Sequence, residues 1–127
     1  MTTTNSMILV AGATREETIH VETCLKGWKY DITPLNIEGT GIDSPIPETP
    51  NMIMVYAQKD KKNTITICEQ FRKDTKGAAI PILLIIGRYK ISQFYELRSR
   101  MGNIASIITP FNREEIRTKI DEILGTT

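Results

Sequence analysis

Hydrophobic residues gather in short runs along this chain, and the runs alternate with segments in which hydrophobic positions recur every three or four residues. Five runs have the length of a β-strand and predict strands. The first, third and fourth runs are continuously apolar, which is typical of strands buried on both faces of a parallel sheet. The predicted strands are Met7–Ala11, Asp31–Leu35, Met52–Ala57, Ile82–Ile86 and Ala105–Thr109.

Two segments carry paired signals for the start of a helix. Thr14 followed by Glu17, and Asn112 followed by Glu115, have the spacing of a capping box, in which each residue's side chain bonds to the other's backbone amide. Hydrophobic residues recur every three or four positions after each pair, as they do in a helix with one buried face. Gly125 is suited to end the second of these helices. Both helices are predicted to cover the sheet.

A helix is also predicted on each side of the fourth strand. Asn63 or Thr64 can cap the helix before that strand, and Gly77 can end it. The helix after that strand has a hydrophobic arc wider than the stripe that a sheet covers, so part of the arc is expected to be exposed. Its expected core residues are Phe94, Leu97 and Met101.

The pattern changes between the second and third strands, where NIEGTGIDSPIPETP contains three prolines and two glycines and has no helical period. We expect irregular backbone from Ile37 to Pro50, with a second helix that is short or missing. The alternation of strands and helices predicts an α/β protein with a doubly wound, five-stranded parallel sheet in (βα)5 order. A single domain is expected over residues 1–127, with residues 1–6 as a frayed N-terminus.

Length and charge exclude several classes of protein. The chain has 127 residues, enough for one domain with one core. Sixteen Lys and Arg against fifteen Asp and Glu give a net charge of +1, so no whole-molecule field attracts nucleic acid or an anionic membrane. The longest apolar run, Ala78–Gly87, has about half the roughly 20 residues that cross a bilayer. The start, MTTTNSM, lacks a signal-peptide pattern, so a cytoplasmic location is expected.

Cysteine and histidine are too few for most metal or nucleophile chemistry. His20 is the only histidine, and Cys24 and Cys68 are far apart in the sequence, so no metal site is predicted. His20 and Cys24 lie four positions apart on one predicted helix, where a cysteine–histidine pair is possible. That spacing arises easily by chance, and we assign no catalytic residue.

Four segments together resemble the receiver domain of two-component response regulators. MILVAGATREE is similar to the first strand and its acidic turn, PNMIMVYAQ to the strand that carries the phospho-accepting aspartate, and IPILLIIG to the fourth strand. SIITPFNREEI is similar to the Lys-Pro-Phe turn into the last helix, and Thr109-Pro110-Phe111 is the strongest of these matches. The resemblance covers nearly the whole chain and implies a flavodoxin-like fold and a role in signal transduction.

The resemblance also implies which residues stand at the phosphorylation site, and they differ from the family's. Receivers need carboxylates for Mg²⁺, an aspartate acceptor, a hydroxyl and a lysine that neutralises developing charge. The carboxylate positions fall on Gly12 and Ala13, the acceptor on Tyr56, the hydroxyl on Ile86 and the lysine on Thr109. The implied site is therefore degenerate, with no metal and no cofactor. Tyr56 is expected to fill the pocket with its hydroxyl at the rim.

Two alternatives remain open at this site, one for the acceptor residue and one for the function. Asp60 is an alternative acceptor, although it lies four positions after Tyr56 among lysines. Gly12-Ala13-Thr14 at a helix N-terminus can offer amides to a phosphate, which leaves a flavodoxin-like nucleotide- or flavin-binding domain as the alternative function. Glu16 and Glu17 would repel an anion there.

The segment after the fourth strand carries the remaining functional candidates. In receivers, protein partners bind the face made by the helix after the fourth strand, the fifth strand and the last helix. On it we expect a protein partner or a second copy to contact Arg88, Tyr89, Ile91, Tyr95 and Ser106.

The resemblance makes Thr109-Pro110 a candidate cis peptide bond. The sequence predicts a pseudo-receiver that is not an enzyme and acts as a phosphorylation-independent interaction module.

Overall fold

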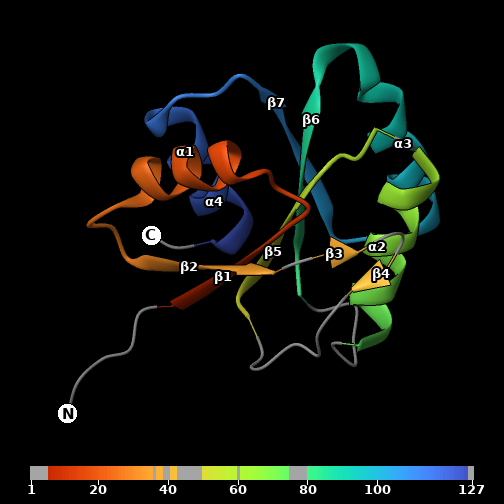
Figure 1. Ribbon diagram of the computed structural model, residues 1–127, viewed down its shortest axis with the longest axis horizontal. Coiled ribbons are helices and arrows are strands. Elements are labelled where there is room, and N and C mark those ends of the chain that lie inside the picture. Colours follow the sequence, from red (N-terminus) through yellow and green to blue (C-terminus); the bar gives the residue numbers. More distant parts are fainter. Residues whose placement is uncertain are drawn as a thin grey trace.

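Five strands form one parallel sheet at the centre of the molecule (Figure 1). The computed structural model describes residues 6–35, 37–38, 41–42, 50–59, 61–74 and 80–125. Each sheet strand starts and ends within one residue of its predicted bounds. Across the sheet, the strands are β2 (Tyr30–Leu35), β1 (Ser6–Ala11), β5 (Met52–Tyr56), β6 (Ile82–Gly87) and β7 (Ile104–Thr109).

The N-terminal boundary of the sheet differs slightly from the prediction. Ser6, expected at the frayed end, is the first residue of β1 and pairs with Tyr30. Residues 1–5 lie outside the described part of the chain. The central strands β5 and β6 are buried along almost their whole length, which explains why their sequences are continuously apolar.

Two helices cover each face of the sheet (Figure 1). Side chains alternate along a strand, so Ile8 and Val10 point to one face and Leu9 and Ala11 to the other. The first set packs with α1 (Arg15–Leu25) and α4 (Arg113–Leu124), and we call this cluster the α1/α4 core. The second packs with α2 (Lys61–Asp74) and α3 (Ile91–Arg100), which form the α2/α3 core.

Both predicted capping boxes are present. The backbone amide of Glu17 donates to Thr14 Oγ1 at 3.1 Å, and that of Thr14 donates to Glu17 Oε1 at 2.8 Å. Asn112 and Glu115 make the same pair of bonds at the start of α4. Gly125 ends α4 in the left-handed region, as its position after the hydrophobic stripe predicts.

The start of α2 was predicted wrongly. The helix begins at Lys61, so Asn63 and Thr64 lie inside it and do not cap it. Thr64 is fully buried, and its hydroxyl accepts a hydrogen bond from the backbone amide of Gln58 at 2.7 Å. The Thr64 side chain, which resembles a helix cap in the sequence, thus holds the loop before the helix. Gly77, the predicted end of α2, lies outside the described residues.

A short antiparallel hairpin follows β2. It consists of β3 (Ile37–Glu38) and β4 (Gly41–Ile42), and β4 contacts α2. The described residues between β2 and β5 contain no helix, as the proline and glycine content predicts. The expectation of irregular backbone from Ile37 onwards was wrong at this hairpin, where the two short strands pair. Residues 36, 39–40 and 43–49 of that stretch are outside the described part. No helix of the described residues is long and apolar enough to cross a bilayer.

The strand order creates a switch point between β1 and β5. The chain leaves β1 towards β2 on one side and later returns to place β5 on the other side. Connections that leave two neighbouring strands in opposite directions open a crevice at their carboxyl ends, where α/β proteins bind ligands. This edge is where the sequence-predicted site lies.

Candidate functional site

The carboxyl ends of four neighbouring parallel strands meet at one edge of the sheet. β1 ends at Ala11, β5 at Tyr56, β6 at Gly87 and β7 at Thr109. The sequence-predicted positions Gly12 and Ala13 follow β1 directly, so the fold brings them to the same edge as Tyr56 and Thr109. Four of the five positions that the resemblance implied therefore lie at the ends of neighbouring strands.

The side chain of Gln58 joins the ends of β1 and β5. Its Nε2 donates to the backbone oxygen of Gly12 at 3.1 Å and to that of Tyr56 at 2.8 Å. Gly12 has a φ of +77°, and a β-carbon there would collide with Gln58 Nε2. Sequence reasoning missed Gln58. The sequence carried one signal for this contact. Gln58 is a polar residue two positions after the apolar strand β5, and Gly12 directly follows β1, the neighbouring strand in the sheet.

Tyr56 lies deeper than the sequence predicted. Its side chain belongs to the α1/α4 core and is only 4% exposed. The hydroxyl is buried, and no described residue gives it a hydrogen-bond partner, so the prediction of a hydroxyl at the rim was wrong. Burial, followed by the negative charge of Glu17, raises the pKa of this phenol above its ordinary value. Tyr56 is therefore a protonated, packed side chain at physiological pH.

Two adjoining cavities flank this residue. One, of about 240 Å³, opens towards the start of the β6–α3 connection, and the other, of about 250 Å³, lies between α1 and the start of α4. Both are lined by Glu17, Tyr56 and Thr109. The first is completed by Ala57, Ile85, Gly87, Tyr89 and Lys90, and the second by Glu16, His20, Pro110 and Phe111.

Ile86 does not reach either cavity. Its side chain is buried in the α2/α3 core, on the opposite face of the sheet from Tyr56. The expectation that Ile86 lines the apolar pocket was therefore wrong, because side chains alternate along β6 and Ile85 points to the cavity instead. Lys90, which sequence reasoning did not assign, lines this cavity from the turn after β6.

The bond between Thr109 and Pro110 is cis, as predicted. Thr109 is half-buried and Pro110 is exposed, and both line the cavity beside α1. The chain turns here from β7 towards α4, and Phe111 packs into the α1/α4 core.

The described residues at this edge do not suit Mg²⁺. A magnesium site takes oxygen ligands, usually with one or two carboxylates, and Gly12, Ala13 and Tyr56 supply no carboxylate. Glu16 and Glu17 are the next acidic residues along the chain, and Glu17 Oε1 already accepts the Thr14 amide. No group of three His, Cys, Asp or Glu residues in the described ranges can hold a metal ion. Asp60, the alternative acceptor, falls outside those ranges.

The structure brings His20 and Cys24 together without making the thiol reactive. Cys24 Sγ lies 3.6 Å from His20 Nε2, and the His20 ring stacks at 5.0 Å on Phe111. Burial raises the pKa of the Cys24 thiol, although Arg113 and Arg117 partly oppose the shift. A thiol held in its protonated form is a poor nucleophile.

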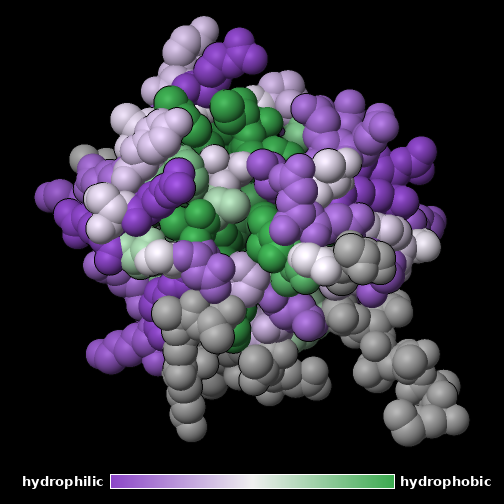
Figure 2. All heavy atoms as spheres, turned by 180° about the vertical axis from the view of Figure 1, so that it is seen from behind, coloured by the Kyte–Doolittle hydropathy of each residue, from purple (hydrophilic) through white to green (hydrophobic). Residues whose placement is uncertain are grey.

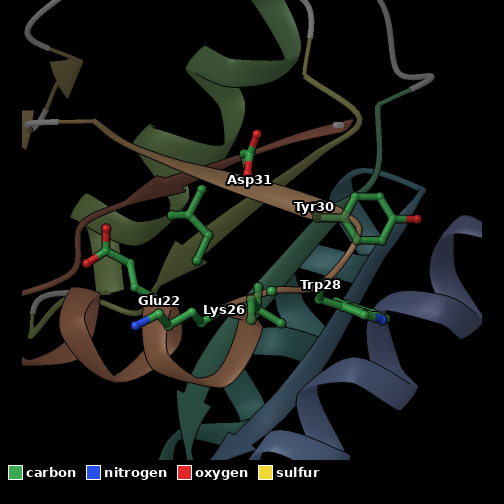
Figure 3. Close-up of a pocket in the computed structure, with 8 residues that line it drawn as sticks. Glu22, Lys26, Trp28, Tyr30 and Asp31 are labelled. Carbon is green, nitrogen blue, oxygen red and sulfur yellow. The ribbon is translucent and has the colours of Figure 1, made fainter. Parts of the chain in front are cut away.

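A further cavity, of about 390 Å³, lies between the end of α1 and the edge strand β2 (Figure 3). Glu22 and Lys26 reach it from α1, and Tyr30 and Asp31 from β2. Trp28, in the turn between them, lies beside α4 (Figure 3). The Arg117 guanidinium stacks 5.1 Å from the Trp28 ring and donates to the backbone oxygens of Cys24 and Lys26. These contacts attach α4 to α1, and none of the sequence-predicted site residues lines this cavity.

The predicted partner-surface residues differ widely in exposure. Tyr89 is 99% exposed and Tyr95 60%, while Arg88 is also exposed. Ile91 is half-buried against the α2/α3 core, and Ser106 is half-buried on β7. Phe94 and Leu97 are buried as predicted, whereas Met101 is only half-buried.

Comparison with known proteins identifies this fold through structure alone. No family model and no curated protein sequence matches the chain. Among solved structures, the N-terminal signal receiver domain of a two-component response regulator from Bacteroides fragilis superposes with a TM-score of 0.74 at 10% identity. That alignment covers 98% of this chain and 100% of that one.

Two further structures are similar over comparable lengths. The receiver domain of a sensor histidine kinase from Pseudomonas aeruginosa PAO1, which has a magnesium ion in its active-site cleft, matches with a TM-score of 0.69 and 15% identity. The alignment covers 97% of this chain and 100% of that one. A two-component response regulator from Clostridium difficile matches with a TM-score of 0.70 and 16% identity, over 95% and 97% of the two chains. The chain therefore has a receiver-like fold.

Proposed function

We propose that this chain is a phosphorylation-independent interaction module built on the receiver fold, and that it is not an enzyme. One observation carries the proposal. At the switch point of the sheet, the Gln58 amide bridges the backbone oxygens of Gly12 and Tyr56, and the positions Gly12, Ala13 and Tyr56 themselves carry no carboxylate. A neutral hydrogen-bonded link thus joins two strand ends that would have to supply acidic groups for phosphoryl transfer.

The chemistry of the remaining groups supports the same conclusion. Phosphoryl transfer needs a nucleophilic oxygen and cations that neutralise the developing charge. Tyr56 is buried, and its pKa is raised, so its hydroxyl is a poor nucleophile. Thr109 carries no charge at the position where the resemblance implies a lysine, and Lys90 reaches the cavity from a different strand connection. The described residues at this edge therefore lack the groups that would activate an acceptor.

The outer face formed by α3, β7 and α4 is where we expect a protein partner to bind. Tyr95 on α3 and Ile108 on the edge strand β7 are exposed, and Tyr89 precedes α3. Figure 2 shows hydrophobic side chains gathered in a central band between hydrophilic flanks on one side of the molecule. An apolar band with a polar border is the composition of many protein interfaces. A signalling role in the cytoplasm is consistent with this use of the fold.

The test is exposure to phosphoryl donors. The protein is incubated with acetyl phosphate and Mg²⁺, or with beryllofluoride and Mg²⁺, beside a receiver domain that retains its aspartate as positive control. We expect no phosphoryl adduct in the intact mass and no change in the amide NMR signals of Gly12 or Tyr56. A stable adduct, or saturable shifts of those signals with Mg²⁺, would overturn the proposal.

The alternative function, binding of a nucleotide or a flavin, is favoured by one observation. Two cavities of about 240 and 250 Å³ adjoin at the switch point, where flavodoxin-like proteins hold ligands. A thermal-shift screen of nucleotides and flavins distinguishes the two functions. A ligand present at 100 times its Kd stabilises the folded protein by about 2.7 kcal/mol, which is a measurable shift in Tm.

A further inference from the structure

Positive charge is concentrated in one layer of the molecule. The helices α2 and α3 and the short turn η1 (Arg88–Lys90) contain eight Lys and Arg but only three Asp and Glu. The helices α1 and α4 contain four Lys and Arg and seven Asp and Glu. The fold places α2 and α3 on one face of the sheet and α1 and α4 on the other (Figure 1). The net charge of +1 therefore conceals a basic layer and an acidic layer.

Three cations on the turn before α3 and on α3 itself have no acidic partner among the described residues. Arg88 and Lys90 belong to the single 3₁₀ turn η1 (Arg88–Lys90), and Arg98 lies on α3. No described residue forms an ion pair with any of the three. By contrast, Arg100 pairs with Glu96 at 3.5 Å, and in the acidic layer Lys119 pairs with Glu122 at 3.6 Å. Arg88 and Arg98 are exposed, so their charges are available to an outside group, and Lys90 is half-buried where it lines the cavity beside Tyr56.

Two exposed tyrosines lie among these cations. Tyr89 stands between Arg88 and Lys90 with 99% of its surface exposed, so the fold itself does not use its ring. Tyr95 follows on α3, three positions before Arg98, and is 60% exposed while its ring contacts Phe94 at 5.3 Å. In Figure 1 the connection between β6 and α3 projects at the top of the molecule. Tyr and Arg are enriched among the residues that contribute most to protein interfaces.

We propose that the η1/α3 surface, made of Arg88, Tyr89, Lys90, Tyr95 and Arg98, binds an acidic segment of a partner protein. This inference rests on the proposed function and specifies the chemistry of the partner. Carboxylates of the partner neutralise the three free cations, and the two tyrosine rings pack against its apolar atoms. Complementary charge of this kind raises the association rate and selects the partner.

A protein segment suits this surface better than the other occupants. A protein that binds nucleic acid typically neutralises several phosphates, and here Glu96 lies on α3 together with Arg98. A symmetric contact with a second copy would place the same cations opposite one another. Three spaced cations with two tyrosines match a short stretch of alternating acidic and apolar residues.

The test compares peptide selection by two variants with the same change in charge. A display library of random peptides is selected on the wild-type chain, on Arg88→Glu/Arg98→Glu and on the control Arg15→Glu/Lys26→Glu, whose exposed cations lie at the two ends of α1. We expect peptides rich in Asp and Glu from the wild type and the control. The α3 variant should lose these peptides, with Kd raised at least about tenfold, and should enrich basic ones instead. Affinity for the selected peptides should fall with added salt.

Each other outcome overturns the inference. Neutral peptides that bind all three proteins equally, or no enrichment on any of them, would show that charge does not define a binding surface here. A labelled oligothymidylate that binds the wild type more tightly than the peptides, and loses binding in the α3 variant, would assign the surface to nucleic acid. Self-association by light scattering that is lost in the same variant would assign it to a second copy.

The failure of this inference is distinguishable from failure of the proposed function. A partner captured from cell lysate that still binds Arg88→Glu/Arg98→Glu would refute the acidic-partner surface and leave the interaction module standing. A phosphoryl adduct would refute the phosphorylation-independent module regardless of the result of the peptide selection. Tyr89→Ala supplies a second check, because it removes an exposed ring that the fold does not need and should weaken binding of the selected acidic peptides without lowering Tm.

Discussion

Gln58 Nε2 occupies the space that a β-carbon at residue 12 would need. The amide holds this place through hydrogen bonds to the backbone oxygens of Gly12 and Tyr56, 46 and two residues away in the sequence. Glycine is therefore favoured at residue 12 for two reasons: its φ is positive, and a β-carbon there would displace the Gln58 amide from its two hydrogen bonds. The link ties together β1 and β5 at the point where the chain reverses its course through the sheet.

Gly12→Ala should destabilise the protein more than Gly27→Ala. Both glycines have positive φ, +77° and +73°, so both substitutions strain the backbone by about 1 kcal/mol. Only residue 12 also has the Gln58 side chain and the Tyr56 oxygen in the way, whereas the space around residue 27 is open. We expect a loss of more than about 2 kcal/mol in the free energy of unfolding for Gly12→Ala, measured by urea denaturation. Equal losses at the two sites would contradict the assigned contact.

The same contact predicts coupling between Gly12 and Gln58. Gln58→Ala alone removes two hydrogen bonds and should cost about 1 to 2 kcal/mol. In the Gly12→Ala/Gln58→Ala protein the collision disappears, so the double variant should be more stable than the sum of the single losses by at least about 0.5 kcal/mol. Additive losses would mean that the amide moves away at no cost.

Tyr56→Phe should leave stability unchanged or raise it by about 1 kcal/mol. The substitution keeps the ring in the α1/α4 core and removes a buried hydroxyl for which the described residues provide no partner. Tyr56→Ala, which also removes the ring, should cost about 3 to 5 kcal/mol. Thermal unfolding of both variants measures the difference, with Tyr95→Phe as an exposed control. A clear loss in Tyr56→Phe would show that the hydroxyl has a stabilising partner.

Cys68 should make the protein less stable at alkaline pH. Burial, opposed by Arg72 and reinforced by Glu69, raises the pKa of this fully buried thiol from 9.0 to about 12. Above pH 9 the unfolded chain loses the proton while the folded chain keeps it, so the stability present below pH 9 is lost as pH rises towards 12. At pH 10 the loss is about 1 kcal/mol relative to pH 7.

Cys68→Val isolates this contribution because valine has a similar volume and no proton to lose. Urea denaturation in reducing buffer at pH 7 and pH 10 should show a smaller alkaline loss in Cys68→Val than in the wild type, by about 1 kcal/mol. Identical pH dependence in the two proteins would rule out Cys68 as the source.

Arg72→Met should destabilise the protein by about 3 kcal/mol. The guanidinium donates to the backbone oxygens of Ile80, Gly102 and Asn103, where β6 and β7 begin. Methionine keeps much of the aliphatic packing but leaves these acceptors without their charged donor. Lys73→Met is the matched control, because Lys73 is the exposed neighbour on α2 and should change stability by less than about 0.5 kcal/mol. Similar effects at the two positions would contradict the anchoring role of Arg72.

The amino-acid sequence by itself determined the strands, the start of α1, both ends of α4 and the order of the fold. The bounds of the five sheet strands followed from hydrophobic runs of strand length, which are continuously apolar in β1, β5 and β6, and the capping boxes at Thr14 and Asn112 use partners only three residues away. Such features depend on residues close together in the chain, so their pattern is visible before the chain folds. The resemblance to receivers added the positions at the carboxyl edge, of which Gly12, Tyr56 and Thr109 lie together as expected.

Tertiary structure decided the features that depend on distant residues. Thr64 looked like a helix cap and instead binds the amide of Gln58, while Ile86 points away from the cavity that its position in the motif suggested. Gln58 meets Gly12 across 46 residues, and Arg72 meets Gly102 across 30. The composition indicated a balanced charge, and the fold places a basic pair of helices on one face of the sheet and an acidic pair on the other. Local patterns fix hydrogen bonds within a turn of helix, whereas packing across the sheet determines which polar side chains meet and which surfaces carry charge.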